Sequence, residues 1–177
     1  GNAMEVRESV EVLAGGGPAD IVELTVALAR EMLSLAGRGD VDPAEALKDG
    51  RAMDVWRRMI AAQGGDPDAP LPVAAHTEVV RAPQDGFVVG MPSRPIAVAA
   101  WRLGAGRARK EDPVDFAAGV EIHRKPGDKV AAGDPVLTLH TSDPSKIARA
   151  LESLEGCVAY GSEPVSVPAM RVIDRIA

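Results

Sequence analysis

Residues 125–139 read KPGDKVAAGDPVLTL, with one Gly-Asp pair at positions 127–128 and a second at 133–134. Aspartate beside glycine is typical of tight turns, because glycine tolerates a left-handed backbone and the carboxylate accepts bonds from nearby backbone amides. The residues after the two turns, 129–130 and 135–140, have the apolar and β-branched character of strands. The stretch therefore predicts short strands separated by tight turns. We interpret Asp128 and Asp134 as turn residues and not as an acid pair.

The rest of the second half continues this pattern. Further strands are expected at residues 77–81, 86–91, 120–123 and 163–167, with turn sequences such as Pro-Gln-Asp-Gly between them. Short helices are expected at residues 93–103 and 143–155. This half is therefore predicted to be a β-rich module with inserted helices.

The first half instead has helical periodicity. Helices are expected at residues 3–14, 18–36, 42–50 and 51–62, each ended by glycine or begun by a cap or proline. Asn2 and Glu5 have the spacing of a capping box for the first helix. The second helix carries one apolar stripe, formed by Ile21, Leu24, Leu28, Met32 and Leu35.

The chain is predicted to have an α+β fold in two parts. Residues 66–72 contain three prolines and no periodicity, which is typical of a domain boundary. We expect a helical segment at residues 1–72 and a barrel-sandwich-like β-rich module at residues 73–177.

Composition excludes several classes of function. The formal net charge is −6, which argues against general binding of nucleic acid or acidic lipid. Aromatic residues make up 3%, too few for a platform that stacks bases. The single cysteine, Cys157, excludes an internal disulfide and fits a reducing cytoplasm. No apolar run approaches the roughly 18 residues of a membrane helix.

Several stretches in a fixed order give the chain a more specific character. They are residues 1–8, 16–20, 24–25, 27–28, 49–52, 61–66, 82–83, 85–88, 103–107, 110–112, 125–130 and 133–134. Together they resemble the pyrimidine-nucleoside and thymidine phosphorylases, over roughly the last two-fifths of such an enzyme. The resemblance implies that residues 1–72 complete the larger α/β domain of a cytoplasmic homodimer. It also implies cleavage of a pyrimidine nucleoside by inorganic phosphate, without a cofactor, to the free base and (deoxy)ribose 1-phosphate.

The resemblance carries over almost no site residues. The family's phosphate-binding and base-binding side chains precede the stretch matched by Gly1, so we assign no catalytic and no substrate-binding residue here and expect the isolated chain to be inactive. Glu8 falls on a glutamate that helps to bind a structural cation in some members. The other cation ligands lie in the part that precedes this match.

Alternatives remain for the function and for three local features. The run 125–139 also resembles a hairpin of biotinyl and lipoyl carriers, although no Met-Lys-Met or Asp-Lys-Ala motif occurs. A nucleoside-monophosphate phosphorylase on the same scaffold is a further alternative.

The loop Gly104–Lys110 is either a phosphate-facing or domain-facing loop, or a surface turn whose cations pair with Glu111 and Asp112. Gly15-Gly16-Gly17 is interpreted as a helix stop in preference to a phosphate cradle. The three histidines, His76, His123 and His140, are too scattered in sequence to suggest a metal site; His123 and His140 are interpreted as structural, with their pairing across strands left open.

Overall fold

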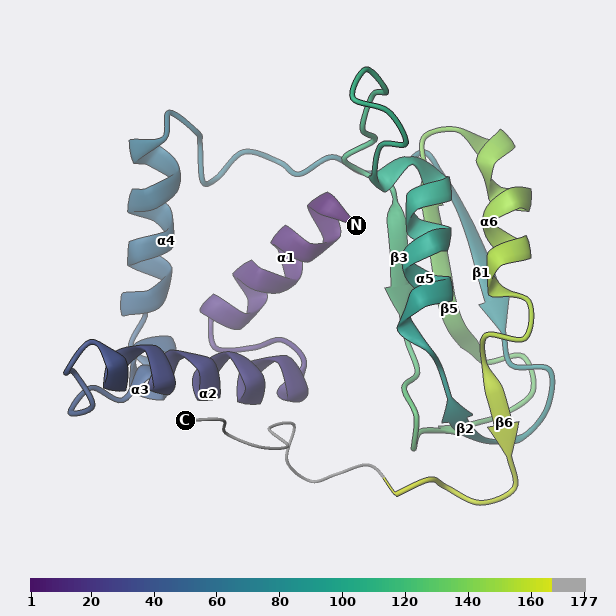
Figure 1. Ribbon diagram of the computed structural model, residues 1–177, viewed down its shortest axis with the longest axis horizontal. Coiled ribbons are helices and arrows are strands. Elements are labelled where there is room, and N and C mark those ends of the chain that lie inside the picture. The colour runs from purple at the N-terminus through teal and green to yellow at the C-terminus, as the bar shows by residue number, and fades with distance from the viewer. Residues whose placement is uncertain (167–177) are drawn as a thin grey trace. The chain divides into compact units, whose positions relative to one another are not determined.

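The computed structural model describes residues 1–166 and contains both helices and antiparallel strands, which confirms the α+β class. Its contacts divide the chain into two compact units. Among the described residues, one unit comprises Gly1–Glu5 and residues 71–166, and the other begins at Val6 and ends at Pro70. Figure 1 traces the elements of both units, which are described separately below.

The helical unit contains most of α1 and three further helices, at the predicted places. They are α1 (Asn2–Leu13), α2 (Ala19–Leu35), α3 (Pro43–Lys48) and α4 (Arg51–Ala62). The Asp42 carboxylate caps α3 by accepting a bond from the amide of Ala44 at 3.1 Å, and Pro43 occupies the first turn. Gly37 follows α2 with φ of 69°, a left-handed conformation that ends a helix at little cost in glycine.

The predicted capping box of α1 is wrong. Asn2 is the first helical residue, and its side-chain amide donates to the carbonyl of Ala105 at 2.9 Å, far along the sequence. The Glu5 carboxylate accepts from the amine of Gly1 at 2.8 Å. Asparagine can cap a helix or bond to a distant carbonyl, and here tertiary contact determines which it does.

The other unit contains two three-stranded antiparallel sheets. The first has the order β1 (His76–Arg81), β5 (Pro135–Thr141), β3 (Gly119–Ile122). The second has the order β4 (Lys129–Val130), β2 (Gly86–Gly90), β6 (Ala159–Gly161). Among the described residues neither sheet closes into a barrel, so the barrel-sandwich description is not confirmed. The strand expected at residues 163–167 is also wrong for 163–166, since the last described strand is β6; Val167 lies outside the described residues.

The two Gly-Asp turns hold the strands together by an identical pair of bonds. Gly127 donates to the carbonyl of Val88, and the Val88 amide donates to the carbonyl of Asp128, at 2.8 and 2.9 Å. Six residues later, Gly133 and Asp134 bind Ala82 in the same way and at the same two distances. Each aspartate carboxylate also accepts the amide three residues before it. Asp128 and Asp134 are therefore turn residues, as predicted.

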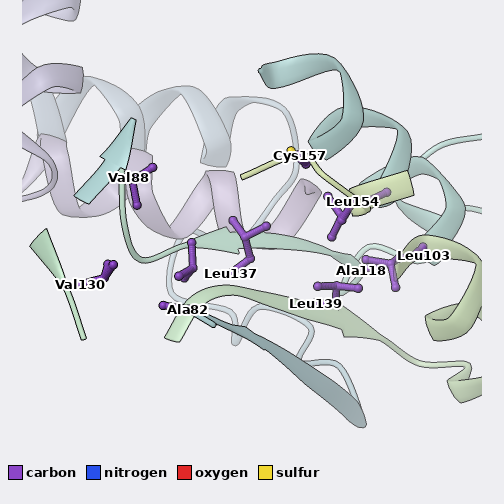
Figure 2. Close-up of a cluster of buried hydrophobic side chains, with 12 residues drawn as sticks. Ala82, Val88, Leu103, Ala118, Val130, Leu137, Leu139, Leu154 and Cys157 are labelled. Carbon is purple, nitrogen blue, oxygen red and sulfur yellow. The ribbon is translucent and has the colours of Figure 1, made fainter. Parts of the chain in front are cut away.

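Two helical segments cover the buried side chains of this unit. α5 (Ser93–Ala100) continues directly into a π-helical turn, η1 (Trp101–Ala105), and a 3-10 turn, η2 (Pro144–Lys146), leads into α6 (Ile147–Leu154). Figure 2 shows Leu103 and Leu154 of these helices in one cluster with Leu137 and Leu139 of β5. Leu103, Leu137 and Leu139 are fully buried. This cluster is the hydrophobic core of the unit.

The substitution Leu139→Ala should lower the free energy of unfolding of this unit by about 2–5 kcal/mol, because it leaves a cavity in the core. Ile122→Ala, on the neighbouring strand, is the matched control, because its side chain is 42% exposed, and it should cost less than about 1 kcal/mol. Urea unfolding followed by Trp101 fluorescence, in a Trp56→Phe background, reports on this unit alone. Equal losses in the two variants would contradict the assignment of the core.

Candidate functional site

The π-helical turn η1 brings three separate parts of the chain to one place. The Leu103 carbonyl accepts the buried Thr141 hydroxyl at 2.8 Å, and the Gly104 carbonyl accepts the amide of Asp115 at 2.9 Å. The Ala105 carbonyl accepts the side chain of Asn2. A π-helical turn leaves carbonyl groups without their usual helical partners, and here each of three successive carbonyls has a tertiary donor. We call the segment that follows, residues 106–115, the basic loop.

Asp115 fixes the far end of the basic loop. One carboxylate oxygen accepts the amide of Ala117 at 3.0 Å, and the other accepts the amide of Ser142 at 2.8 Å. Partial burial alone would raise the pKa of the Asp115 carboxyl, but the bonds from Ser142 and Ala117 and the nearby Lys146 ammonium outweigh it. The pKa of this group therefore lies below its ordinary value.

The cations of the basic loop do not have the expected partners. Across residues 1–166, no ion pair joins Arg107, Arg109 or Lys110 to Glu111 or Asp112. Asp112 instead accepts the amides of Ala108 and Arg109, and the Arg107 guanidinium donates to the carbonyl of Lys110. The loop is a surface turn with its own backbone bonds, and its three cations are exposed.

The glycine run after α1 is a helix stop, as predicted. The amides of Gly15 and Gly16 donate to the carbonyls of Val12 and Glu11, so neither is free for an anion. Gly17 has φ of 79°, and a Cβ there would lie 2.6 Å from the Val12 side chain. Only glycine fits this close turn back toward α2.

His123 and His140 bond to side chains of neighbouring strands, and Cys157 is buried. His123 bonds to the Thr138 hydroxyl at 2.7 Å, whereas His140 lies 3.3 Å from the Glu121 carboxylate, so the two histidines do not pair with each other. His76 is exposed. Cys157 is 3% exposed, and desolvation raises the pKa of its thiol, which makes it a poor nucleophile.

Glu8 lies partly buried in α1. In the described part of the chain, no three His, Cys, Asp or Glu side chains are grouped so as to hold a metal ion. The role of Glu8 as a cation ligand therefore stays a prediction.

Two hollows on the surface are open and shallow. One, of about 710 Å³, lies on α3 and α4 beside Arg51, Arg57 and Arg58, of which the first two pair with Asp49 and Asp68. The other, of about 340 Å³, lies between α5 and α6 beside Arg94 and Arg102. Neither is an enclosed pocket in which polar groups converge on a small molecule.

The chain is similar to known proteins over almost its whole length. Residues 87–161 match the family model of the pyrimidine nucleoside phosphorylase C-terminal domain. The chain is 49% identical over 176 residues to a thymidine phosphorylase of Mycobacterium tuberculosis, covering 99% of this chain and 41% of that protein. It is also 41% identical over 153 residues to a pyrimidine-nucleoside phosphorylase of Bacillus subtilis, covering 80% of this chain and 35% of that protein. The chain is therefore similar over almost its whole length to these phosphorylases, and residues 87–161 match their C-terminal domain.

A Staphylococcus aureus pyrimidine-nucleoside phosphorylase is similar as well, with 37% identity over 166 residues, 86% of this chain and 38% of that protein. The chain thus spans about two-fifths of the length of the phosphorylases that it matches. None of the helices described within residues 1–166 combines the length and the apolar composition needed to cross a membrane.

Sequence analysis identified the basic loop by its glycines and cations but missed what positions it. The one local signal of the π-helical turn is Gly104, whose φ of 113° is non-helical and favours glycine. Asn2 was predicted to cap the first helix, and its bond to Ala105 was not predicted. The carboxylate of Asp115 had no motif that would identify it.

Asp115→Asn should lower the free energy of unfolding by about 1–2 kcal/mol near pH 7, because asparagine offers one acceptor oxygen to two backbone amides. The carboxylate has a folded pKa below its ordinary 3.8, so its stabilising contribution is present above that value and is lost as the pH falls below it. The difference between wild type and variant should therefore shrink toward about pH 3. Urea unfolding at both pH values measures it; an unchanged difference would contradict the role of the charge.

Proposed function

We propose that this chain supplies the C-terminal scaffold of an enzyme that cleaves thymidine, or a related pyrimidine nucleoside, with inorganic phosphate. The products are the free base and (deoxy)ribose 1-phosphate. The reaction requires a phosphate oxygen to be held against the anomeric carbon while charge develops on the sugar and the base. On this proposal, other parts of the enzyme bind phosphate and base, and the present residues provide no catalytic group.

One observation supports the proposal more than any other. The similarity to the Mycobacterium tuberculosis thymidine phosphorylase runs through both units, over 99% of this chain. A stand-alone β module on a reused scaffold would match only in its own region. The whole stretch, including the helices, therefore has the organisation of a phosphorylase.

The remaining features of the proposed enzyme follow from the same relationship. We propose that residues 1–72 complete the larger α/β domain and that residues 73–177 form the β-rich module attached to it. The enzyme is expected to act as a cytoplasmic homodimer with phosphate as co-substrate and no organic cofactor. Glu8 would contribute one ligand to a structural cation.

A chimeric enzyme tests this function directly. The matched C-terminal stretch of the Mycobacterium tuberculosis thymidine phosphorylase is replaced by this chain, and release of thymine from thymidine and phosphate is measured. We expect activity within about tenfold of the parent, because the catalytic groups stay on the parent portion and the scaffold is similar.

The controls are the isolated chain and the truncated parent without its C-terminal stretch, both of which are expected to release no thymine. A chimera that folds with native-like stability but has no activity would contradict the proposal. Measurable thymine release by the isolated chain would contradict the absence of catalytic residues within it.

The apolar stripe of α2 supports the view that the helical unit packs against further protein. Leu28, Met32 and Leu35 are 56%, 64% and 85% exposed, and Val26 is the only buried residue of α2. α3 and α4 have no buried residue. An exposed apolar stripe of this kind marks an interaction surface, and for an isolated chain it favours self-association.

The double substitution Leu28→Gln and Met32→Gln should reduce both self-association in sedimentation experiments and the binding of an apolar fluorescent dye. Glutamine is a good helix former, so the helical circular dichroism should be retained. Val73→Gln is the matched control, because Val73 is 79% exposed but lies outside the helices. A wild-type chain that is monomeric and binds no dye would contradict the interpretation of the stripe.

A further inference from the structure

The first turn of α1 belongs to a different unit from the rest of the helix. Gly1–Glu5 cluster with residues 71–166, whereas the rest of α1 clusters with the helical unit. The helix itself is continuous from Asn2 to Leu13. The first turn of α1 is therefore part of the β-rich unit.

Two hydrogen bonds join this first turn to the two ends of the basic loop. The Asn2 side chain donates to Ala105, the residue before the loop, and the Ala3 amide donates to the carbonyl of Phe116, the residue after it, at 3.0 Å. The bond from Asp115 to Gly104 crosses the base of the loop beside them. Arg107, Ala108 and Arg109 bond to Lys110 and Asp112 within the loop.

Close backbone packing holds the first turn in place. A Cβ built on Gly119, at the start of β3, would lie 2.8 Å from the Cα of Gly1, and one built on Gly1 would lie 2.7 Å from the Cα of Gly119. Ala3 is only 5% exposed. The contact therefore depends on two glycines facing each other, and any larger side chain would displace the helix.

We propose that the first turn of α1 is a clasp that closes the base of the basic loop, and that release of the clasp frees the loop with its three cations. The proposal goes beyond the phosphorylase assignment, and its test measures loop opening instead of catalysis.

Limited digestion with trypsin tests the clasp, since the loop offers cleavage sites after Arg107, Arg109 and Lys110. Asn2→Asp removes the donor to Ala105 but leaves an acidic residue at a helix N-terminus, where it is favourable, so the helix itself should persist. The variant should be cleaved in the loop about three- to tenfold faster than wild type, as expected for the loss of one hydrogen bond that opposes local opening. Amide exchange of Asp115, measured by NMR, should accelerate by a similar factor.

Two further variants keep the test decisive. Gly119→Ala should release the clasp from the opposite side and give the same loop cleavage. Thr138→Val removes the bond to His123 in the same unit without touching the loop, and it should leave the cleavage rate unchanged. Wild-type cleavage in both clasp variants would overturn the proposal, and so would global unfolding in both, reported by Trp101 fluorescence, since Asn2 and Gly119 would then be general stabilising residues.

Discussion

The position of strand β5 determines most of the β-rich unit. It pairs with β1 on one side and with β3 on the other, so its backbone groups are satisfied within the sheet. Its side chains Val136, Leu137 and Leu139 are fully buried, and the core helices pack over them. The strand ends at Thr141, whose buried hydroxyl donates to the Leu103 carbonyl of the π-helical turn. Sheet, core and junction are therefore linked through one strand, and a change in its register would disturb all three.

The helical unit has a different physical basis. α2 carries an apolar stripe, yet the stripe is exposed, and the buried apolar residues of this unit are Val12 and Val26. A unit of about 65 residues with so little burial lacks the favourable term that offsets the entropy of folding. Its helices are defined locally, by Gly37, by the Asp42 cap and by the glycine run after α1. Burial within residues 6–70 therefore contributes little to their stability.

Local chemistry explains which parts of the structure were predictable. α4 was expected at residues 51–62 and was found there, because glycines bound it on both sides and the residues between favour a helix. β6 was misplaced, because a three-residue strand is defined by its pairing with β2 and not by its own composition. The candidate site divides in the same way. The basic loop could be identified from its glycines and cations. Its attachments could not, because Asn2 lies 103 positions from its partner Ala105 and Asp115 acts through a single carboxylate, and neither leaves a pattern in the sequence.

The paired Gly-Asp turns also account for the resemblance between this module's hairpin and the hairpins of carrier domains. Gly127 and Gly133 have φ of 101° and 89°, and each turn binds its partner strand through the backbone of Val88 or Ala82. Such bonds need glycine for the left-handed turn and aspartate for the carboxylate bond, but they place no demand on the remaining side chains. A protein that uses this scaffold therefore retains the same two motifs whether or not it also has a lysine to modify. The motifs specify the way the strands are joined, and the function has to be inferred from the chain as a whole, helices included.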